Sequence, residues 1–184
     1  MRLAILEELE PGHLRWQVFG PPILAALLFG AFAFHFGFEP LLFVRSIFIL
    51  VLVQVIFFDF EHRLILDRIM FPSMAFALFL SLFRDPWWAG LAAGLGAGLL
   101  FLVLSLAGSA ILKAEALGLG DVKLALFMGL LLGILPMLQA VFYGVFMAGI
   151  VSIGLIVWRR SLRGTLAYGP YLAAGAIIVL FILP

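Results

Sequence analysis

Residues 41–58 read LLFVRSIFILVLVQVIFF, an apolar run with a single charged residue, Arg45. A run of about 18 residues is long enough for a helix to cross the hydrocarbon core of a bilayer. Its hydrophobicity is continuous and does not alternate, so it is typical of a membrane helix and not of a strand in a transmembrane barrel.

The same pattern repeats along the chain of 184 residues, which is 66% hydrophobic and 11% charged. Soluble domains carry about 25% charged residues. We therefore expect an all-α, polytopic transmembrane helical bundle of six to eight spans, with seven favoured. The apolar runs divide at charges and at Pro/Gly clusters, and they lie near residues 18–37, 41–58, 68–83, 87–112, 122–136, 138–158 and 166–184. The run at 122–136 is short, and it is either tilted or joined to its neighbour at Pro136.

The N-terminal residues and the absence of cysteine each exclude some classes of protein. Residues 1–17 contain three acidic residues and predict a cytosolic amphipathic lead-in, not a cleavable signal peptide, which leaves 18–184 as the transmembrane domain. A chain without cysteine has no thiol nucleophile, disulfide or Cys-ligated metal. We expect no cofactor and no metal.

The positive charges predict the orientation. With a cytosolic N-terminus, nine of the eleven Lys and Arg residues fall on cytosolic segments, and only Arg45 and Arg84 fall toward the outside. The sequence thus predicts a multi-pass protein of the cytoplasmic (inner) membrane. Both acidic motifs described next then face the cytosol.

Two aspartates, Asp59 and Asp121, stand 62 residues apart at the edges of apolar runs. Keeping a carboxylate charged near a bilayer is unfavourable, so such residues tend to be functional. Asp121 follows Gly118 and Gly120, which let a substrate backbone approach closely. It also precedes a helix expected from residue 122, whose N-terminal dipole favours negative charge. Taken singly, each aspartate is equally typical of a helix cap or an interface anchor.

A pair of aspartates is a recognised peptide-hydrolysing arrangement. One carboxylate can deprotonate the attacking water while a carboxylic acid protonates the leaving amine. Two neighbouring carboxyl groups tend to share one proton and titrate as a unit.

Three motifs together resemble the type IV prepilin peptidases, the Gly-x-Gly-Asp family of membrane aspartic proteases. The first is DFEHRLILD at 59–67, with Leu66 where the family usually has Pro. The second is EALGLGDVKL at 115–124. The third is AYGPY at 167–171, which is similar to the family's Pro-Phe-Gly-Pro-Phe.

The resemblance implies that Asp59 and Asp121 are the catalytic pair, with Asp67 as the competing candidate for the first role and otherwise a supporting or helix-capping residue. It implies a prepilin or pseudopilin precursor as substrate, with a basic leader followed by an apolar helix, and cleavage at the cytosolic face. Membrane lipid is the other expected partner, and nucleic acid is not. Many bacterial members carry a Cys-x-x-Cys domain associated with N-methylation. This chain has no cysteine, so the resemblance supports peptidase activity and leaves methyltransferase activity open.

The remaining motif residues are expected to shape the site or contact substrate, with a solvated membrane-edge turn, an edge anchor or a helix cap as the alternatives. They are Glu61, His62, Arg63, Asp67, Glu115, Gly118, Gly120, Lys123, Gly169 and Pro170.

A stripe of small residues contains Gly90, Gly94 and Gly98, spaced so that they share one helix face. Such stripes let helices approach closely. Packing within the bundle is favoured, and a homodimer interface is the alternative.

Two other function classes compete with the protease. A cation transporter or channel would use the acidic cluster at the cytosolic edge as an oxygen-rich site. Against it, no charge in the middle of the spans traces a path. A catalytically silent assembly subunit would have no need for both aspartate motifs.

Overall fold

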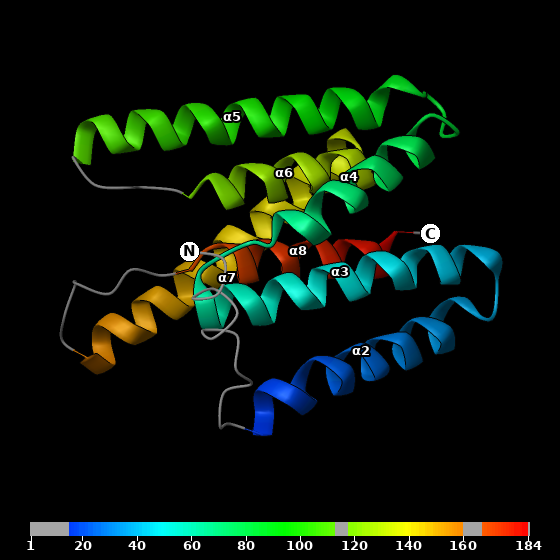
Figure 1. The fold of residues 1–184 in the computed structure, drawn as a ribbon, viewed down its shortest axis with the longest axis horizontal. Coiled ribbons are helices and arrows are strands. Elements are labelled where there is room, and N and C mark those ends of the chain that lie inside the picture. Colours follow the sequence, from blue (N-terminus) through cyan, green and yellow to red (C-terminus); the bar gives the residue numbers. More distant parts are fainter. Residues whose placement is uncertain (1–14, 113–117, 160–166, 184) are drawn as a thin grey trace.

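The computed structural model describes residues 15–112, 118–159 and 167–183. In these ranges the chain forms seven helices and no strand (Figure 1). The helices are α2 (Arg15–Phe36), α3 (Pro40–His62), α4 (Asp67–Ser81), α5 (Trp88–Leu112), α6 (Leu119–Leu132), α7 (Ile134–Arg159) and α8 (Gly169–Ile182). The expected polytopic helical bundle is confirmed. Most of the predicted lead-in lies outside the described residues, and 15–17 already belong to α2.

Four of these helices are long and apolar enough to cross a membrane. They contain the spans Phe19–Phe36, Pro40–His62, Trp88–Ala110 and Ile134–Leu155. The other three helices, α4, α6 and α8, are shorter, with 14 or 15 residues each. Large apolar side chains on the outside of the bundle remain exposed, as expected where lipid and not water is the neighbour.

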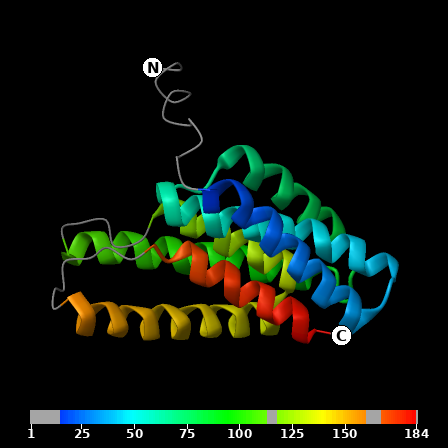
Figure 2. The same cartoon turned by 90° about the horizontal axis from the view of Figure 1, so that it is seen from below.

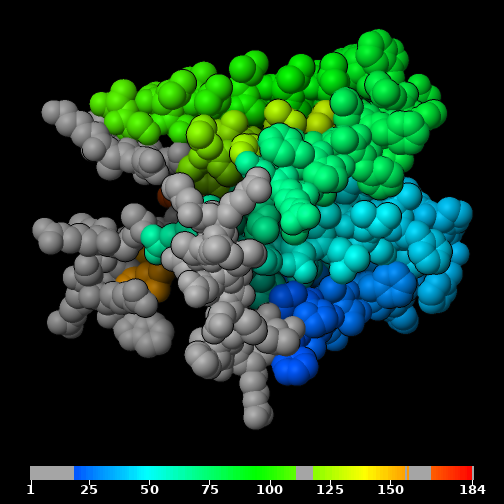
Figure 3. Space-filling model, viewed as in Figure 1, coloured from blue at the N-terminus to red at the C-terminus, as the bar shows by residue number. Residues whose placement is uncertain are grey.

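The short helix α6 lies at the centre of the bundle. It contacts α5, α4, α8 and α7, while α3 packs on α8 and carries α2 on its outer side. Figures 1 and 2 show this order, and in Figure 3 α5 (green) and α2 (blue) form opposite edges. Because neighbours surround α6, its side chains are buried along most of its length, with Leu124, Phe127 and Met128 fully inaccessible.

A seam of glycines joins α5 to α6. A Cβ atom added at Gly129 would lie 2.5 Å from the carbonyl oxygen of Ala93, and one added at Gly94 would lie 3.0 Å from the carbonyl oxygen of Leu126. Added Cβ atoms at Gly90 and Gly98 would likewise meet residues of α6. The stripe therefore packs within the bundle. A homodimer through the same glycines would require α5 to separate from α6, and we do not propose one.

Two helix boundaries differ from the expectation. The segment ending at residue 58 continues as helix to His62, so Asp59 lies inside the last turn of α3 and not at the start of a loop. The boundary expected at Pro136 falls instead at Gly133, whose φ of +83° suits glycine. Pro136 sits in the first turn of α7, where its missing N–H leaves no helical hydrogen bond unmade.

The end of α6 away from Asp121 is capped by an arginine. Nη1 of Arg84 lies 3.1 Å from the carbonyl oxygens of both Leu131 and Leu132. These carbonyls belong to the last turn of α6, which has no helical donors for them. A cation there also complements the negative end of the helix dipole.

Candidate active site

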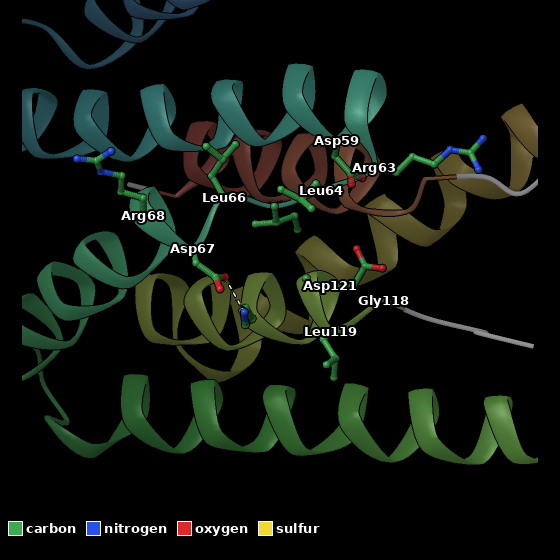
Figure 4. Close-up of a pocket in the computed structure, with 12 residues that line it drawn as sticks. Asp59, Arg63, Leu64, Leu66, Asp67, Arg68, Gly118, Leu119 and Asp121 are labelled. Atoms are coloured by element: carbon green, nitrogen blue, oxygen red, sulfur yellow. Dashed lines mark hydrogen bonds and ion pairs between the residues drawn. The ribbon is translucent and has the colours of Figure 1, made fainter. Parts of the chain in front are cut away.

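Asp59 and Asp121 come together at the first residue of α8. A Cβ atom added at Gly169 would lie 2.6 Å from Oδ2 of Asp59 and 3.4 Å from Oδ1 of Asp121. The two carboxyl groups therefore flank one small region of space, although they come from α3 and α6. Figure 4 shows both side chains directed into the space between these helices.

The end of α3 places Asp59. Arg63, with φ of +50°, forms a left-handed C-cap and donates its N–H to the carbonyl oxygen of Asp59 at 3.0 Å. This turn directs the Asp59 side chain inward, so that the residue is only 6% exposed. The carboxylate accepts a hydrogen bond from the backbone N–H of Gly169, at the N-terminus of α8. A buried carboxylate requires such donors, and a helix N-terminus supplies them.

The start of α6 places Asp121. Gly118 is the N-cap, and its carbonyl oxygen accepts the Asp121 N–H at 3.0 Å. The Asp121 carboxylate in turn accepts the N–H of Gly118, as in one half of a capping box. Asp121 lies outside the four helices that are long and apolar enough to cross a membrane. Burial, and then the nearby charge of Asp59, raise its pKa from 3.8 to about 6 against the opposing effect of the Gly118 hydrogen bond.

A cavity of about 470 Å³ contains both carboxyl groups. Its volume falls in the range of about 300–1,000 Å³ typical of ligand sites. Two of its lining residues, Leu64 of the α3–α4 loop and Leu119 of α6, are 59% and 64% exposed. The lining comes from the end of α3, the α3–α4 loop, the start of α4 and the beginning of α6: Asp59, Arg63, Leu64, Ile65, Leu66, Asp67, Arg68, Gly118, Leu119, Gly120, Asp121 and Lys123.

The third acidic residue of the motifs has a different partner. Asp67 is the first residue of α4, and its Oδ1 lies 2.5 Å from Nζ of Lys123. Asp67 is the acidic residue in the first turn of α4, and Leu66 holds the N-cap position before it. The geometry thus brings Asp121 to Asp59 and Lys123 to Asp67.

The other motif residues fall in three groups. Glu61 and His62 lie in the last turn of α3 outside the cavity lining, with Oε2 and Nδ1 3.9 Å apart. Gly169 and Pro170 are buried at the start of α8. Glu115 lies outside the described residues.

Two contacts of the site were not anticipated from the sequence. Ile65 packs against Gly120, where an added Cβ would meet its side chain at 3.2 Å. Phe60 and Tyr171 form an edge-to-face pair between α3 and α8, with ring centroids 6.0 Å apart. Both partners of the first contact lie within the motifs, but the spacing of residues does not show which of them touch.

Within residues 15–112, 118–159 and 167–183, no group of three or more His, Cys, Asp or Glu side chains is arranged to hold a metal ion. The cation-transport alternative therefore has no ligand cluster to support it in these ranges.

Comparisons with known proteins point to one family. The model of the type IV leader peptidase family matches residues 46–153, a range that includes both Asp59 and Asp121. The chain is 32% identical over 160 residues to "Prepilin leader peptidase/N-methyltransferase" of Bacillus subtilis (strain 168). That alignment covers 85% of this chain and 62% of the relative, so the chain spans less than two thirds of the relative's length. No solved structure matches. Because the family model covers more than half of the sequence, including both aspartates that meet at Gly169, the chain belongs to the type IV leader peptidase family.

Proposed function

We propose that this protein is a membrane aspartic endopeptidase that removes the leader from type IV prepilin-like precursors. The observation that carries the proposal is the meeting of Asp59 and Asp121 against Gly169, inside a cavity large enough for a peptide segment. Membership of the family supports a peptide bond as the target. The convergence of two carboxyl groups supports general acid–base hydrolysis of that bond by the aspartate pair.

The reaction uses the pair with one shared proton. The ionised carboxylate accepts a proton from water as the water oxygen attacks the carbonyl carbon of the scissile bond. The protonated carboxyl group gives its proton to the departing nitrogen as the C–N bond breaks. One water is consumed, a carboxyl and an amino terminus are released, and the pair still holds one proton with the two roles exchanged. No covalent intermediate forms.

The charges of the bundle support a cytosolic position for the site. Arg63, Arg68 and Lys123 lie at the end that carries the aspartates. Lys and Arg gather on the cytosolic side of membrane proteins. The long helices α5 and α7 also end toward this side, and Lys113 and Arg160 follow them in the sequence. The peptide bond would therefore be cut at the inner face of the cytoplasmic membrane.

The cavity walls fit a precursor whose leader is followed by an apolar helix. Exposed Leu64 and Leu119 flank the aspartates and offer apolar contacts beside the polar centre. The curated relative carries the name of a prepilin leader peptidase and of an N-methyltransferase, and this chain spans 62% of it. We propose peptidase activity for this chain, because Asp59 and Asp121 meet within its described residues.

The test is cleavage of a leader-bearing precursor by the purified protein, with the products identified by mass. Asp59→Asn and Asp121→Asn keep the size of each side chain and remove its acid–base function. Each should reduce the cleavage rate by at least about 10²–10⁴-fold. Glu39→Gln, the same chemical change at the exposed start of α3 far from the site, serves as the control and should cleave at the wild-type rate. Cleavage retained in either aspartate variant would contradict the proposal.

A chelator separates the aspartate mechanism from a metal-dependent one. Cleavage by the wild type should persist in EDTA, because the carboxyl pair needs no ion to activate water. Loss of cleavage in EDTA, restored by a divalent cation, would overturn the mechanism while leaving the peptidase activity in place.

A further inference from the structure

The ion pair between Asp67 and Lys123 joins the two motif segments. Oδ1 of Asp67, at the first residue of α4, lies 2.5 Å from Nζ of Lys123, in the first turns of α6. The same ammonium group stands over the ring of Phe71, 5.5 Å from its centroid. Both contacts of Lys123 are therefore made with α4, and neither is made with Asp59 or Asp121.

A second contact fixes the same two segments nearby. Ile65, in the loop before α4, packs on Gly120, the residue next to Asp121. Lys123 and Gly120 flank Asp121 along the first turns of α6. The turn that carries Asp121 is thus held to the α3–α4 segment at two points, on either side of the aspartate. Figure 4 shows the ion pair as a dashed line beside the space that Asp121 faces.

The spacing of Asp59 and Asp121 matters because the rate of peptide hydrolysis depends steeply on the alignment of the reacting groups. A displacement of about 1 Å can cost roughly 100-fold in rate. Asp59 is fixed by the end of α3 and by Gly169. Asp121 belongs to a different helix, so its distance from Asp59 depends on how α6 sits against the segment that follows α3.

We propose that Asp67 and Lys123 are positioning residues that hold the first turns of α6 against the α3–α4 segment and so set the spacing of Asp59 and Asp121. This inference rests on the proposed function. It assigns Lys123 a role different from substrate binding, because its ammonium group is already engaged by Asp67 and Phe71. Both residues are partly exposed, so the pair acts as a tether at the rim of the cavity and contributes little to overall stability.

The first experiment is a double-mutant cycle with neutral variants. Asp67→Asn and Lys123→Met should each lower kcat by about tenfold and leave KM within about twofold, because the reacting groups are misaligned while the substrate surface persists. The double variant should also be about tenfold slower than the wild type, because the second change removes an interaction that the first has already broken. Glu39→Gln, a distant carboxylate-to-amide change, is the control and should behave as the wild type.

The second experiment measures the distance between the α3–α4 segment and the start of α6 directly. The chain has no cysteine, so Leu64→Cys and Leu119→Cys together provide two unique spin-label sites on the exposed sides of the cavity. With the ion pair intact, the label-to-label distance distribution should be narrow. In the Asp67→Asn and Lys123→Met backgrounds it should broaden in the same way. A distribution unchanged in both backgrounds would overturn the proposal.

Two kinetic results would contradict the proposal. If the two single effects multiply, so that the double variant is about a hundredfold slower, the residues act independently. If Lys123→Met raises KM and leaves kcat unchanged, Lys123 binds the substrate. Both results leave the proposed aspartate-pair peptidase intact, because it is tested separately by the cleavage rates of Asp59→Asn and Asp121→Asn and by cleavage in EDTA.

Discussion

Gly169 stands so close to Asp59 that it leaves no room for a side chain: an added Cβ would lie 2.6 Å from Oδ2 of that carboxylate. The backbone N–H of Gly169 donates to the same carboxylate. The glycine therefore serves two purposes at the start of α8. It brings a hydrogen-bond donor and the positive end of the helix dipole to Asp59, and it keeps the space beside Asp121 open.

Gly169→Ala should abolish cleavage, because the new methyl group would push Asp59 away from the donor and intrude toward Asp121. We expect a rate reduction of at least about 100-fold, the cost of a displacement on the order of 1 Å. The matched control is Gly149→Ala on α7, where an added Cβ meets no atom within 4 Å. Cleavage assays on both purified variants compare the two, and an active Gly169→Ala protein would show that the spacing seen at α8 is not required.

The pH dependence of cleavage should reflect the shared proton. Burial and the charge of Asp59 raise the pKa of Asp121 to about 6. The pair loses its one proton as the pH rises through this value, and it gains a second proton at lower pH. We therefore expect a bell-shaped profile of kcat/KM whose alkaline limb has an apparent pKa of about 6. A profile that is flat between pH 5 and 8 would contradict the requirement for one shared proton.

The same raised pKa predicts how folding stability changes with pH. Between about pH 4 and 6, the folded state keeps a proton on Asp121 that the unfolded chain has released. The contribution of Asp121 to the free energy of unfolding is thus fully present at a pH below 3.8, the ordinary pKa of the group. It declines as the pH rises through about 6. Asp121→Asn removes this dependence.

Thermal unfolding in detergent measures the difference between Asp121→Asn and the wild type. We expect the variant to be the more stable protein at pH 7–8 and the two to differ little at pH 4. A variant less stable than the wild type at pH 8 would mean that the ionised carboxylate stabilises the fold.

The glycine seam between α5 and α6 should be sensitive to a single methyl group. An added Cβ at Gly129 would lie 2.5 Å from backbone atoms of Ala93 and Gly94, so the helices must separate to accept it. Overpacking of this kind costs about 1–3 kcal/mol. In thermal unfolding, Gly129→Ala should therefore lose about 2–12 °C in Tm for a chain of this size. Gly96→Ala, on the open side of α5, is the control and should leave Tm unchanged or slightly raised.

Much of the fold could be predicted because hydrophobicity alone dictates where membrane helices lie. Each of the seven apolar runs corresponds to one helix of the described residues. The helix boundaries differ from the expectation where a charged residue or a proline lies at the end of an apolar run. Asp59 does not end α3, because a single carboxylate that finds a donor on α8 is compatible with a helical backbone. Pro136 does not separate α6 from α7, because a proline fits in a first turn and Gly133 makes the break.

The site was less predictable, because contacts between helices depend on how each helix is rotated about its axis. The family motifs indicated Asp59, Asp121 and Gly169 as separate residues, but not that the glycine touches both carboxyl groups. The motifs indicate Asp67 as a competing catalytic candidate or a supporting, helix-capping residue, and Lys123 as a substrate contact or an edge anchor. Their pairing across 56 positions depends on the relative placement of α4 and α6, which no local pattern contains.

The shortness of α6 has a consequence for how a substrate must present itself. A helix of 14 residues is about 21 Å long, whereas the hydrocarbon core is about 30 Å thick. The longer helices α5 and α7 extend past the start of α6 in Figure 1, so the end of α6 that bears Asp121 is recessed between them. Under the proposed function, we therefore expect the scissile bond to reach the aspartates as extended chain that enters between these two helix ends. Precursors whose first helical turn melts readily at the cut point would be processed faster than those with a rigid turn there.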